Sequence, residues 1–310
     1  MSKAQSTSMF SGRQVSAVVL VVGLIAGVLA IGWNWWNHSS LDPKAVFWGA
    51  LQNNLATPGV TVTQSATASG TTTAQSNQFD FGPNKRAKTI TTFSQDDAQV
   101  RTLELSTPTG DFTKYITIQP GKAQVQNAAA IKQVLNIWAN TTAAGANKDP
   151  GVPSTFPTVL LTLAVPVGGF TPANQQALLT EMKTRQVYTP DLTSVQKAHV
   201  AGHLQYTYKV TMQPILYVQL MKDYATFMGM HELANVDPNS YATTTVTAMT
   251  WTVDARSRQL TSISYESHTE KYSGFGLPIT DQPPTKTISG TDLQQRVSAL
   301  QNQIQTFPGQ

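Results

Sequence analysis

Two histidine motifs are the first places where this sequence could do chemistry. His199 and His203, in the segment HVAGH, have the spacing that places both imidazoles on one side of an extended strand, where they could bind a metal ion as a pair. No third ligand is evident beside them, so two surface histidines are the simpler interpretation. His231 and Glu232 begin like a zinc protease motif, but HELAN lacks the second histidine that this motif requires.

Candidate nucleophiles are equally sparse. Ser194 and Lys197 have the Ser-x-x-Lys spacing in which a lysine activates a serine, but the partner signatures are missing and the segment reads as a loop before a strand. The chain has no cysteine, which excludes disulfides, thiolate nucleophiles and cysteine-bound metal clusters. The sequence therefore predicts a protein that is not an enzyme and that uses no cofactor and no metal.

A stripe of aromatic, leucine and methionine side chains is better suited to holding an apolar ligand. It lies on the helix predicted over residues 214–230, and its members are Tyr217, Leu220, Met221, Tyr224, Phe227 and Met228. We predict that Leu135, Trp138 and the apolar piece 159–165 join this stripe over a cavity for acyl chains. Ordinary core packing explains the same pattern, because cores and cavity linings share one composition.

The energy of lipid transfer sets a condition on such a cavity. Each methylene that leaves a bilayer must recover about 0.8 kcal/mol, so a fourteen-carbon chain needs roughly 11 kcal/mol of apolar contact. A long, dry cavity close to the membrane would meet this condition.

The bulk composition is that of a folded chain with few charges. Of the 310 residues 40% are hydrophobic and 12% are charged, and 21 basic against 17 acidic residues give a net charge of +4. This excess is too small to indicate nucleic-acid binding.

Residues 15–36 form an uncharged apolar run, VSAVVLVVGLIAGVLAIGWNWW. As a helix it is about 33 Å long, enough for a bilayer core. Three tryptophans stand at one end, and Lys3 and Arg13 precede the other. We expect residues 1–14 to be a cytoplasmic tail and the chain after Trp36 to be extracytoplasmic, at a bacterial plasma membrane. A cleaved signal peptide is the alternative, since Ala30 to Gly32 is a tolerable cleavage site.

Only five residues, 37–41, separate this run from Asp42 and Pro43, which are typical of a helix start. Five extended residues reach no more than about 18 Å, so the outer domain is expected to sit against the membrane surface. The sequence predicts a helix over 42–55 and then Thr-rich strands over 60–119. Helices follow over 127–142, 171–185 and 214–230, with strands over 202–213, 243–255 and 259–274, and an amphipathic helix over 290–305.

Strands and helices do not alternate as βαβ units in this order, and no segment repeats, which predicts an α+β fold. We expect the transmembrane helix to be followed by a curved antiparallel sheet, a half-barrel, with helices packed on one face. The extracytoplasmic domain is assigned to residues 41–290, and residues 291–310 form a C-terminal amphipathic helix and tail.

The end of the last predicted strand resembles a known family. The segment TVDA, the strand QLTSISYE and the stretch KYSGFGLPITDQPP are similar to the end of the sheet in lipoprotein carriers, the LolA/LolB-like and LppX/LprG-like proteins. The matching residues are Tyr272, Ser273, Phe275, Gly276 and Pro278. The resemblance implies a half-barrel that binds lipid, with Phe275 at its rim and in the ligand-binding set. It also implies that glycine bends the last strand and that proline leaves its edge without a donor. This chain departs from the family by lacking a lipidation cysteine and by adding the terminal helix.

Two functions follow as hypotheses. The first is a single-pass, membrane-anchored envelope protein that binds a lipid or glycolipid in a half-barrel cavity without catalysis. The second is a structural or interaction module with a filled core, which would contact other envelope proteins through Asp292 to Gln305.

Overall fold

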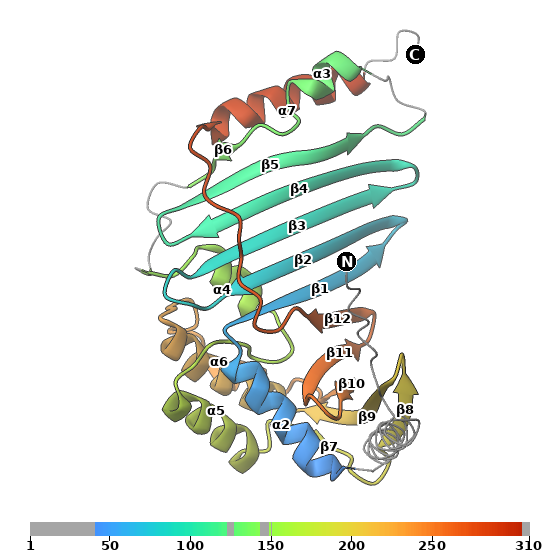
Figure 1. Ribbon diagram of the computed structural model, residues 1–310, viewed down its shortest axis with the longest axis vertical. Coiled ribbons are helices and arrows are strands. Elements are labelled where there is room, and N and C mark those ends of the chain that lie inside the picture. Colours follow the sequence, from blue (N-terminus) through green and yellow to red (C-terminus); the bar gives the residue numbers. More distant parts are fainter. Residues whose placement is uncertain (1–40, 123–126, 143–148, 150, 306–310) are drawn as a thin grey trace, which may run out of the picture.

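The computed structural model describes residues 41–122, 127–142, 149 and 151–305 (Figure 1). The predicted cytoplasmic tail, 1–14, and the predicted transmembrane segment, 15–36, lie outside these residues. Within the described part, no helix has both the length and the apolar character needed to cross a membrane. The predicted α+β class is confirmed, because helices pack on one large, open and curved antiparallel sheet.

Among the described residues, the sheet has thirteen strands in the order β13-β6-β5-β4-β3-β2-β1-β12-β11-β10-β9-β7, and β8 pairs with β9 beside this path. The strands are β1 (Gly59–Ala68), β2 (Thr71–Asp80), β3 (Arg86–Gln95), β4 (Ala98–Thr107), β5 (Gly110–Gln119), β6 (Ala139–Asn140), β7 (Tyr188–Pro190), β8 (Gln196–Val200), β9 (His203–Met212), β10 (Thr247–Asp254), β11 (Gln259–Tyr265), β12 (His268–Ser273) and β13 (Ile288–Ser289). β13 and β6 run parallel, and the other pairs are antiparallel.

The Thr-rich segments form the meander β1 to β5, as the alternation of apolar and polar residues predicts. Threonine favours extended backbone because its branched Cβ packs well on a pleated surface. The turn between β1 and β2 is Ser69 and Gly70, with φ of 49° and 78°. Two successive left-handed residues match the twist of the flanking strands, so this turn fixes the register of the hairpin.

The two faces of the sheet are covered by different parts of the chain. Val60 and Val62 on β1 lie on one face of the sheet with Phe79, which pairs with Val60, and Ala87, which pairs with Phe79. All four are buried in the main core. We call this the helix face, because Phe156 of α4 (Thr155–Leu160) packs edge-on against Phe79 there. The opposite side of the sheet is called the strap face.

Helices α2 (Pro43–Ala56), α5 (Pro172–Thr184) and α6 (Pro214–Met228) cover the helix face near β9 to β11 (Figure 1). α2 begins as predicted, since the Asp42 side chain accepts hydrogen bonds from the amides of Lys44 (3.1 Å) and Ala45 (3.3 Å). Phe47 of α2 stacks on Trp251 of β10 with ring centroids 5.1 Å apart. A short 3₁₀ helix, η1 (Pro238–Tyr241), contacts α6.

A second, smaller core lies at the other end of the sheet. It is formed under α7 (Gly290–Gln305) and the short α3 (Ala128–Lys132), and its buried members are Val134, Ala139, Leu293 and Leu300. Figure 1 shows α7 and α3 at one end of the long axis and α2 with α5 at the other. The two hydrophobic cores are therefore separated along the sheet.

Residues 274–287, which we call the strap, connect β12 to β13 across the strap face (Figure 1). The Pro278 carbonyl accepts from Gln78 Nε2 (3.2 Å), and the Asp281 carboxylate pairs with Lys88 Nζ (2.6 Å). The expectation that this segment closes a sheet edge is wrong, because β12 lies inside the sheet between β1 and β11. Its glycines and prolines instead turn the chain out of the sheet and carry it to α7.

The segment 127–142 differs from the predicted helix. Only Ala128–Lys132 is helical, and Ala139–Asn140 joins the sheet as β6. The break lies at Asn136, which has φ of 59° and donates its amide hydrogen bond to the Tyr115 carbonyl (2.8 Å). Pairing with β5 therefore outweighs the helical periodicity here.

Candidate functional site: an apolar cleft under α7

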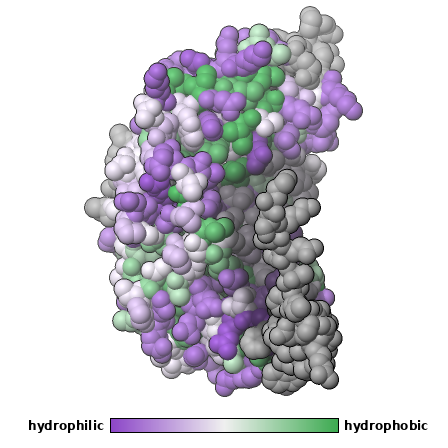
Figure 2. Space-filling view, viewed as in Figure 1, coloured by the Kyte–Doolittle hydropathy of each residue, from purple (hydrophilic) through white to green (hydrophobic). Residues whose placement is uncertain are grey.

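A cleft of about 310 Å³ lies between α7 and strands β3 to β5, and we call it the α7 cleft. Its lining residues are Phe93, Gln95, Ala98, Gln99, Val100, Tyr115, Ile118, Gln119, Pro120, Val297, Leu300 and Gln301. Figure 2 looks onto the strap face, where hydrophobic side chains also gather beside α7 at this end of the molecule. The volume is at the lower end of the range for small-molecule sites, about 300 to 1,000 Å³.

The register of the sheet produces the apolar floor of the cleft. Phe93 pairs with Val100, and Val100 pairs with Ile118, so the three side chains form one row across β3, β4 and β5. Because Phe93 lies an even number of residues from Ala87, this row is on the helix face. The row continues the face that carries the main core, but α7 covers it only in part.

The roof of the cleft comes from α7. Val297 and Leu300 are three residues apart, so they lie on the same side of the helix and face the sheet. Phe93 is 45% exposed, which is high for a large apolar side chain. The cleft therefore presents apolar surface that this chain leaves uncovered.

The remaining polar lining residues are uncharged. Gln95, Gln99, Gln119 and Gln301 supply amide donors and acceptors, and no lining residue of the cleft carries a charge. Burial raises the pKa of Tyr115, so its phenol stays neutral at physiological pH. An apolar floor with neutral hydrogen-bonding groups suits an uncharged or weakly polar amphiphile.

The stripe predicted on residues 214–230 lies elsewhere, on α6. Leu220, Met221, Tyr224 and Met228 are buried in the main core. Tyr217 packs against that core, and its hydroxyl donates to the Leu163 carbonyl. These side chains therefore hold α6 against the sheet and the loop after α4.

Two other predicted ligand-binding residues are not near α6. Leu135 forms an isolated β-bridge with Tyr115 of β5. Lys114 Nζ lies over the Trp138 ring, 4.5 Å from its centre. Phe275 packs against the main core just after β12, and Phe227 is 40% exposed on α6. The structure thus divides the predicted set between two ends of the sheet. Tyr115, which we did not predict, pairs with Leu135 and also lines the α7 cleft.

Little in the sequence indicates that the α7 cleft is a site. Its residues come from three strands and the terminal helix, and each strand segment alternates in the same way as the rest of the meander. The exposed Phe93 is the one residue whose type marks the place, because a phenylalanine in a polar Thr-rich strand indicates an apolar neighbour.

A buried polar cluster lies on β12, at the border between the covered and open parts of the helix face. Glu270 has no exposed surface, and its oxygens accept from the Ala164 amide at 3.1 and 3.3 Å. The Tyr272 hydroxyl, His268 Nε2 (3.3 Å) and Gln64 Nε2 (3.5 Å) complete the cluster. Burial, reinforced by the negative charge of Glu270, raises the pKa of Tyr272 well above its usual value. The cluster ties the loop after α4 to the sheet.

The histidine motifs do not assemble a metal site. His199 lies on β8 and His203 on β9, so a hairpin turn separates them and the expectation of one shared strand is wrong. His203 Nδ1 contacts Asp254 Oδ2 at 2.9 Å, and His231 Nδ1 contacts Asp149. Among the described residues, no three histidine, aspartate or glutamate side chains are grouped as metal ligands.

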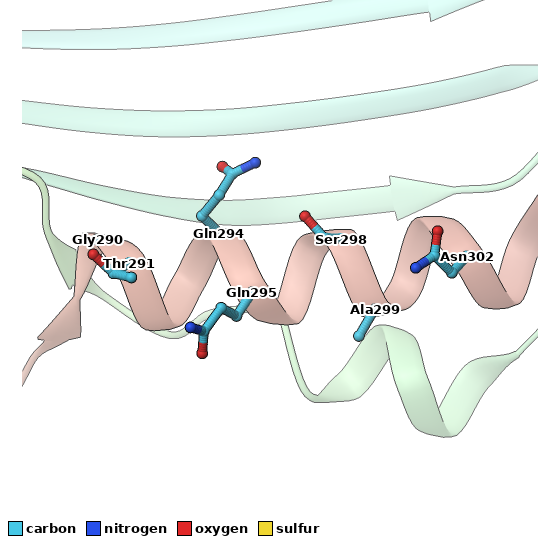
Figure 3. Close-up of a pocket in the computed structure, with 7 residues that line it drawn as sticks. All are labelled: Gly290, Thr291, Gln294, Gln295, Ser298, Ala299 and Asn302. Atoms are coloured by element: carbon cyan, nitrogen blue, oxygen red, sulfur yellow. The ribbon is translucent and has the colours of Figure 1, made fainter.

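The outward side of α7 is polar. Figure 3 shows its labelled side chains, among them Gln294, Gln295, Ser298 and Asn302, beside an open surface depression. The apolar residues Leu293, Val297 and Leu300 are used within the chain, against the sheet. The predicted partner-binding segment therefore offers polar groups to any partner, including the exposed charges of Asp292 and Arg296.

No protein-family model and no curated protein matches this sequence. Among solved structures, the crystal structure of LprF from Mycobacterium bovis is similar over 80% of this chain and 100% of that chain, with a TM-score of 0.42 and 11% sequence identity. A likeness at this level assigns neither a family nor a ligand to the chain.

Proposed function

We propose that this protein is a membrane-anchored envelope protein that binds a hydrophobic ligand, a lipid or glycolipid, in the α7 cleft and does not change it chemically. The observation that carries the proposal is the continuous row Phe93, Val100 and Ile118, roofed by α7 but not filled by it. Apolar surface left open in this way is characteristic of ligand and partner sites.

The anchoring half of the proposal rests on the sequence. The uncharged run 15–36 is long enough to span a bilayer, and the folded domain begins five residues later, at Asp42. On this account the N-terminus is cytoplasmic and the domain is extracytoplasmic.

The size of the cleft limits how tightly a ligand is held. A fourteen-carbon chain costs roughly 11 kcal/mol to remove from a bilayer, and a cleft that buries half of it returns about half of that energy. The α7 cleft therefore suits one chain that exchanges readily, in contrast to the long closed cavity expected from the sequence.

A structural or interaction role is the second candidate. The filled main core, in which Trp251, Tyr188 and Tyr206 are fully buried, favours it. Under this alternative the cleft accepts an apolar side chain of an envelope partner in place of a lipid.

A photoactivatable fatty acid added to the full-length protein in detergent tests the proposal. We expect the label on peptides from β3 to β5 and from α7, and its displacement by unlabelled lipid. The variant Phe93→Asn should reduce the labelling several-fold, and Phe227→Asn, which removes an equally exposed phenylalanine from α6, should leave it unchanged. Labelling concentrated on α6 would contradict the proposal and favour the stripe predicted from the sequence.

A further inference from the structure

We infer that the edge of the sheet formed by β8 and the loop before it, residues 191–202, docks on the surface of the phospholipid bilayer in which the chain is anchored. The inference goes beyond ligand binding and rests on the proposed anchor. It concerns the orientation of the domain on the membrane, and therefore the distance of the α7 cleft from the bilayer.

The point at which the chain enters the folded domain is fixed. The amide of Leu41 donates to the Tyr206 hydroxyl at 2.7 Å, and this hydroxyl donates to the Leu41 carbonyl at 2.9 Å. Tyr208 donates to the Pro43 carbonyl at 2.9 Å. Both tyrosines are on β9, so the chain arrives from residues 1–40 beside this strand.

β8 is the immediate neighbour of that point. Lys197 of β8 pairs with Tyr206, and its Nζ lies 5.1 Å from the centre of the Tyr206 ring. Four residues, 37–40, connect Leu41 to the apolar run that ends at Trp36. Trp36 and Leu41 are five residue steps apart and so are separated by at most about 18 Å, which places the membrane surface within reach of β8.

The surface of this edge has the composition of an interfacial contact. All five residues of β8 are exposed, and within the described residues its only strand partner is β9. Val200, the last residue of β8, is 50% exposed, and Leu192, in the loop before β8, is 38% exposed. Lys197 stands between them, and a lysine can extend its ammonium group to lipid headgroups while its stem stays in the apolar layer.

The charges around this edge nearly balance. Lys44, Lys197, Lys209 and Arg256 are the basic groups of this region, Asp42, Asp191 and Asp254 are the acidic groups, and His199 and His203 lie beside the β8–β9 turn. Such a surface is held by apolar insertion more than by attraction to anionic lipids, whose effect is about 1 kcal/mol per basic residue. Docking is therefore expected to resist high salt.

This orientation places the α7 cleft away from the bilayer. The strand order puts eight interstrand steps between β9 and β5, each about 4.8 Å, so the cleft stands up to about 40 Å from the docked edge. Figure 1 shows the β8–β9 hairpin toward one end of the long axis and α7 at the other. A ligand in the cleft would be presented to the envelope space and not to the membrane of origin.

Because the chain has no cysteine, a single fluorescent label reports on any chosen site. We would prepare Val200→Cys, Leu192→Cys and the distal control Ser298→Cys in the full-length protein, label each with an environment-sensitive dye, and reconstitute them in phosphatidylethanolamine and phosphatidylglycerol vesicles that carry a headgroup quencher. We expect quenching at positions 200 and 192 to exceed that at 298 several-fold, at both 0.1 and 1 M salt.

Equal quenching at the three positions, stronger quenching at 298, or loss of the difference at 1 M salt would overturn the inference. Failure of the protein to float with the vesicles would overturn it together with the anchor. The fatty-acid labelling in detergent is independent of both, so a failed orientation and a failed ligand proposal are distinguishable.

Discussion

The Tyr206 hydroxyl binds both backbone groups of Leu41, a residue 165 positions earlier in the chain. The tyrosine itself is fully buried on β9, and its ring lies under Lys197. One side chain thereby joins the start of the folded domain to an edge of the sheet.

Tyr206→Phe removes both hydrogen bonds and leaves the part-buried amide and carbonyl of Leu41 without these partners. We expect the free energy of unfolding to fall by about 1 to 2 kcal/mol. Urea denaturation of the full-length protein in detergent, followed by tryptophan fluorescence, measures the change. Tyr241→Phe, at a 40% exposed tyrosine, is the matched control and should change stability by much less.

Glu270→Gln should destabilise the protein by about 1 to 3 kcal/mol, because an amide has only one acceptor oxygen for the donors that surround this position. The Ala164 amide and the Tyr272 hydroxyl would compete for it. Hydrogen exchange should accelerate in the loop after α4, residues 161–167, more than in β3 and β4. Glu266→Gln, on the exposed turn before β12, should leave both measurements unchanged; an equal effect of the two variants would refute this role for Glu270.

Glu181 makes stability depend on pH at the contact between α5 and α6. Burial, assisted by a hydrogen bond to Asp223 and by the charge of Asp223, raises the pKa of Glu181 to about 7, and Arg185 opposes the shift. Since the folded state holds this proton more tightly than the unfolded state, its contribution is intact below about pH 4.5 and is lost as pH rises through 7.

Because a glutamine does not ionise, Glu181→Gln removes this loss of stability at high pH. Relative to the unmodified protein, the variant should gain about 1 kcal/mol at pH 8, after allowing for solvent screening, and little at pH 4. Thermal melting at both pH values measures the difference, and Glu232→Gln serves as an exposed control. A gain that is the same at pH 4 and pH 8 would show that ionisation of Glu181 is not its cause.

The local elements were largely predictable from the sequence. Asp42 and Pro43 start α2 as expected, the Thr-rich segments form β1 to β5, and α6 spans Pro214–Met228 within the predicted 214–230. Each of these rests on signals within a few residues, namely a capping side chain, alternation or helical spacing.

The arrangement of the elements was less predictable, because it depends on pairing between distant segments. β12 pairs with β1 although the paired residues are 204 to 212 positions apart in the sequence, and this pairing makes an expected edge strand internal. The predicted strand over 259–274 is two strands, since Glu266 turns the chain with φ of 49°. Neither feature has a signature in composition or periodicity.

Locating a ligand site from the sequence also requires knowing how distant segments pair. Tyr224 and Met228 have the pattern of a cavity lining, but they contact the core because α6 lies flat on the helix face. Phe93 and Ile118 became neighbours through the register of β3, β4 and β5. Periodicity identifies which side of an element is apolar, and only the tertiary arrangement decides what covers that side.

The most direct test of the central claim is native mass spectrometry of the full-length protein extracted from a bacterial membrane, compared with the variant Ala98→Trp. Ala98 lines the α7 cleft, so an indole at this position should fill it, whereas Ala248→Trp puts the same group on an exposed site of β10. We predict a discrete bound lipid on the unmodified protein and on Ala248→Trp, and its loss from Ala98→Trp. An unmodified protein that stays free of lipid after incubation with envelope lipids, or an Ala98→Trp variant that keeps the bound species, would contradict the account.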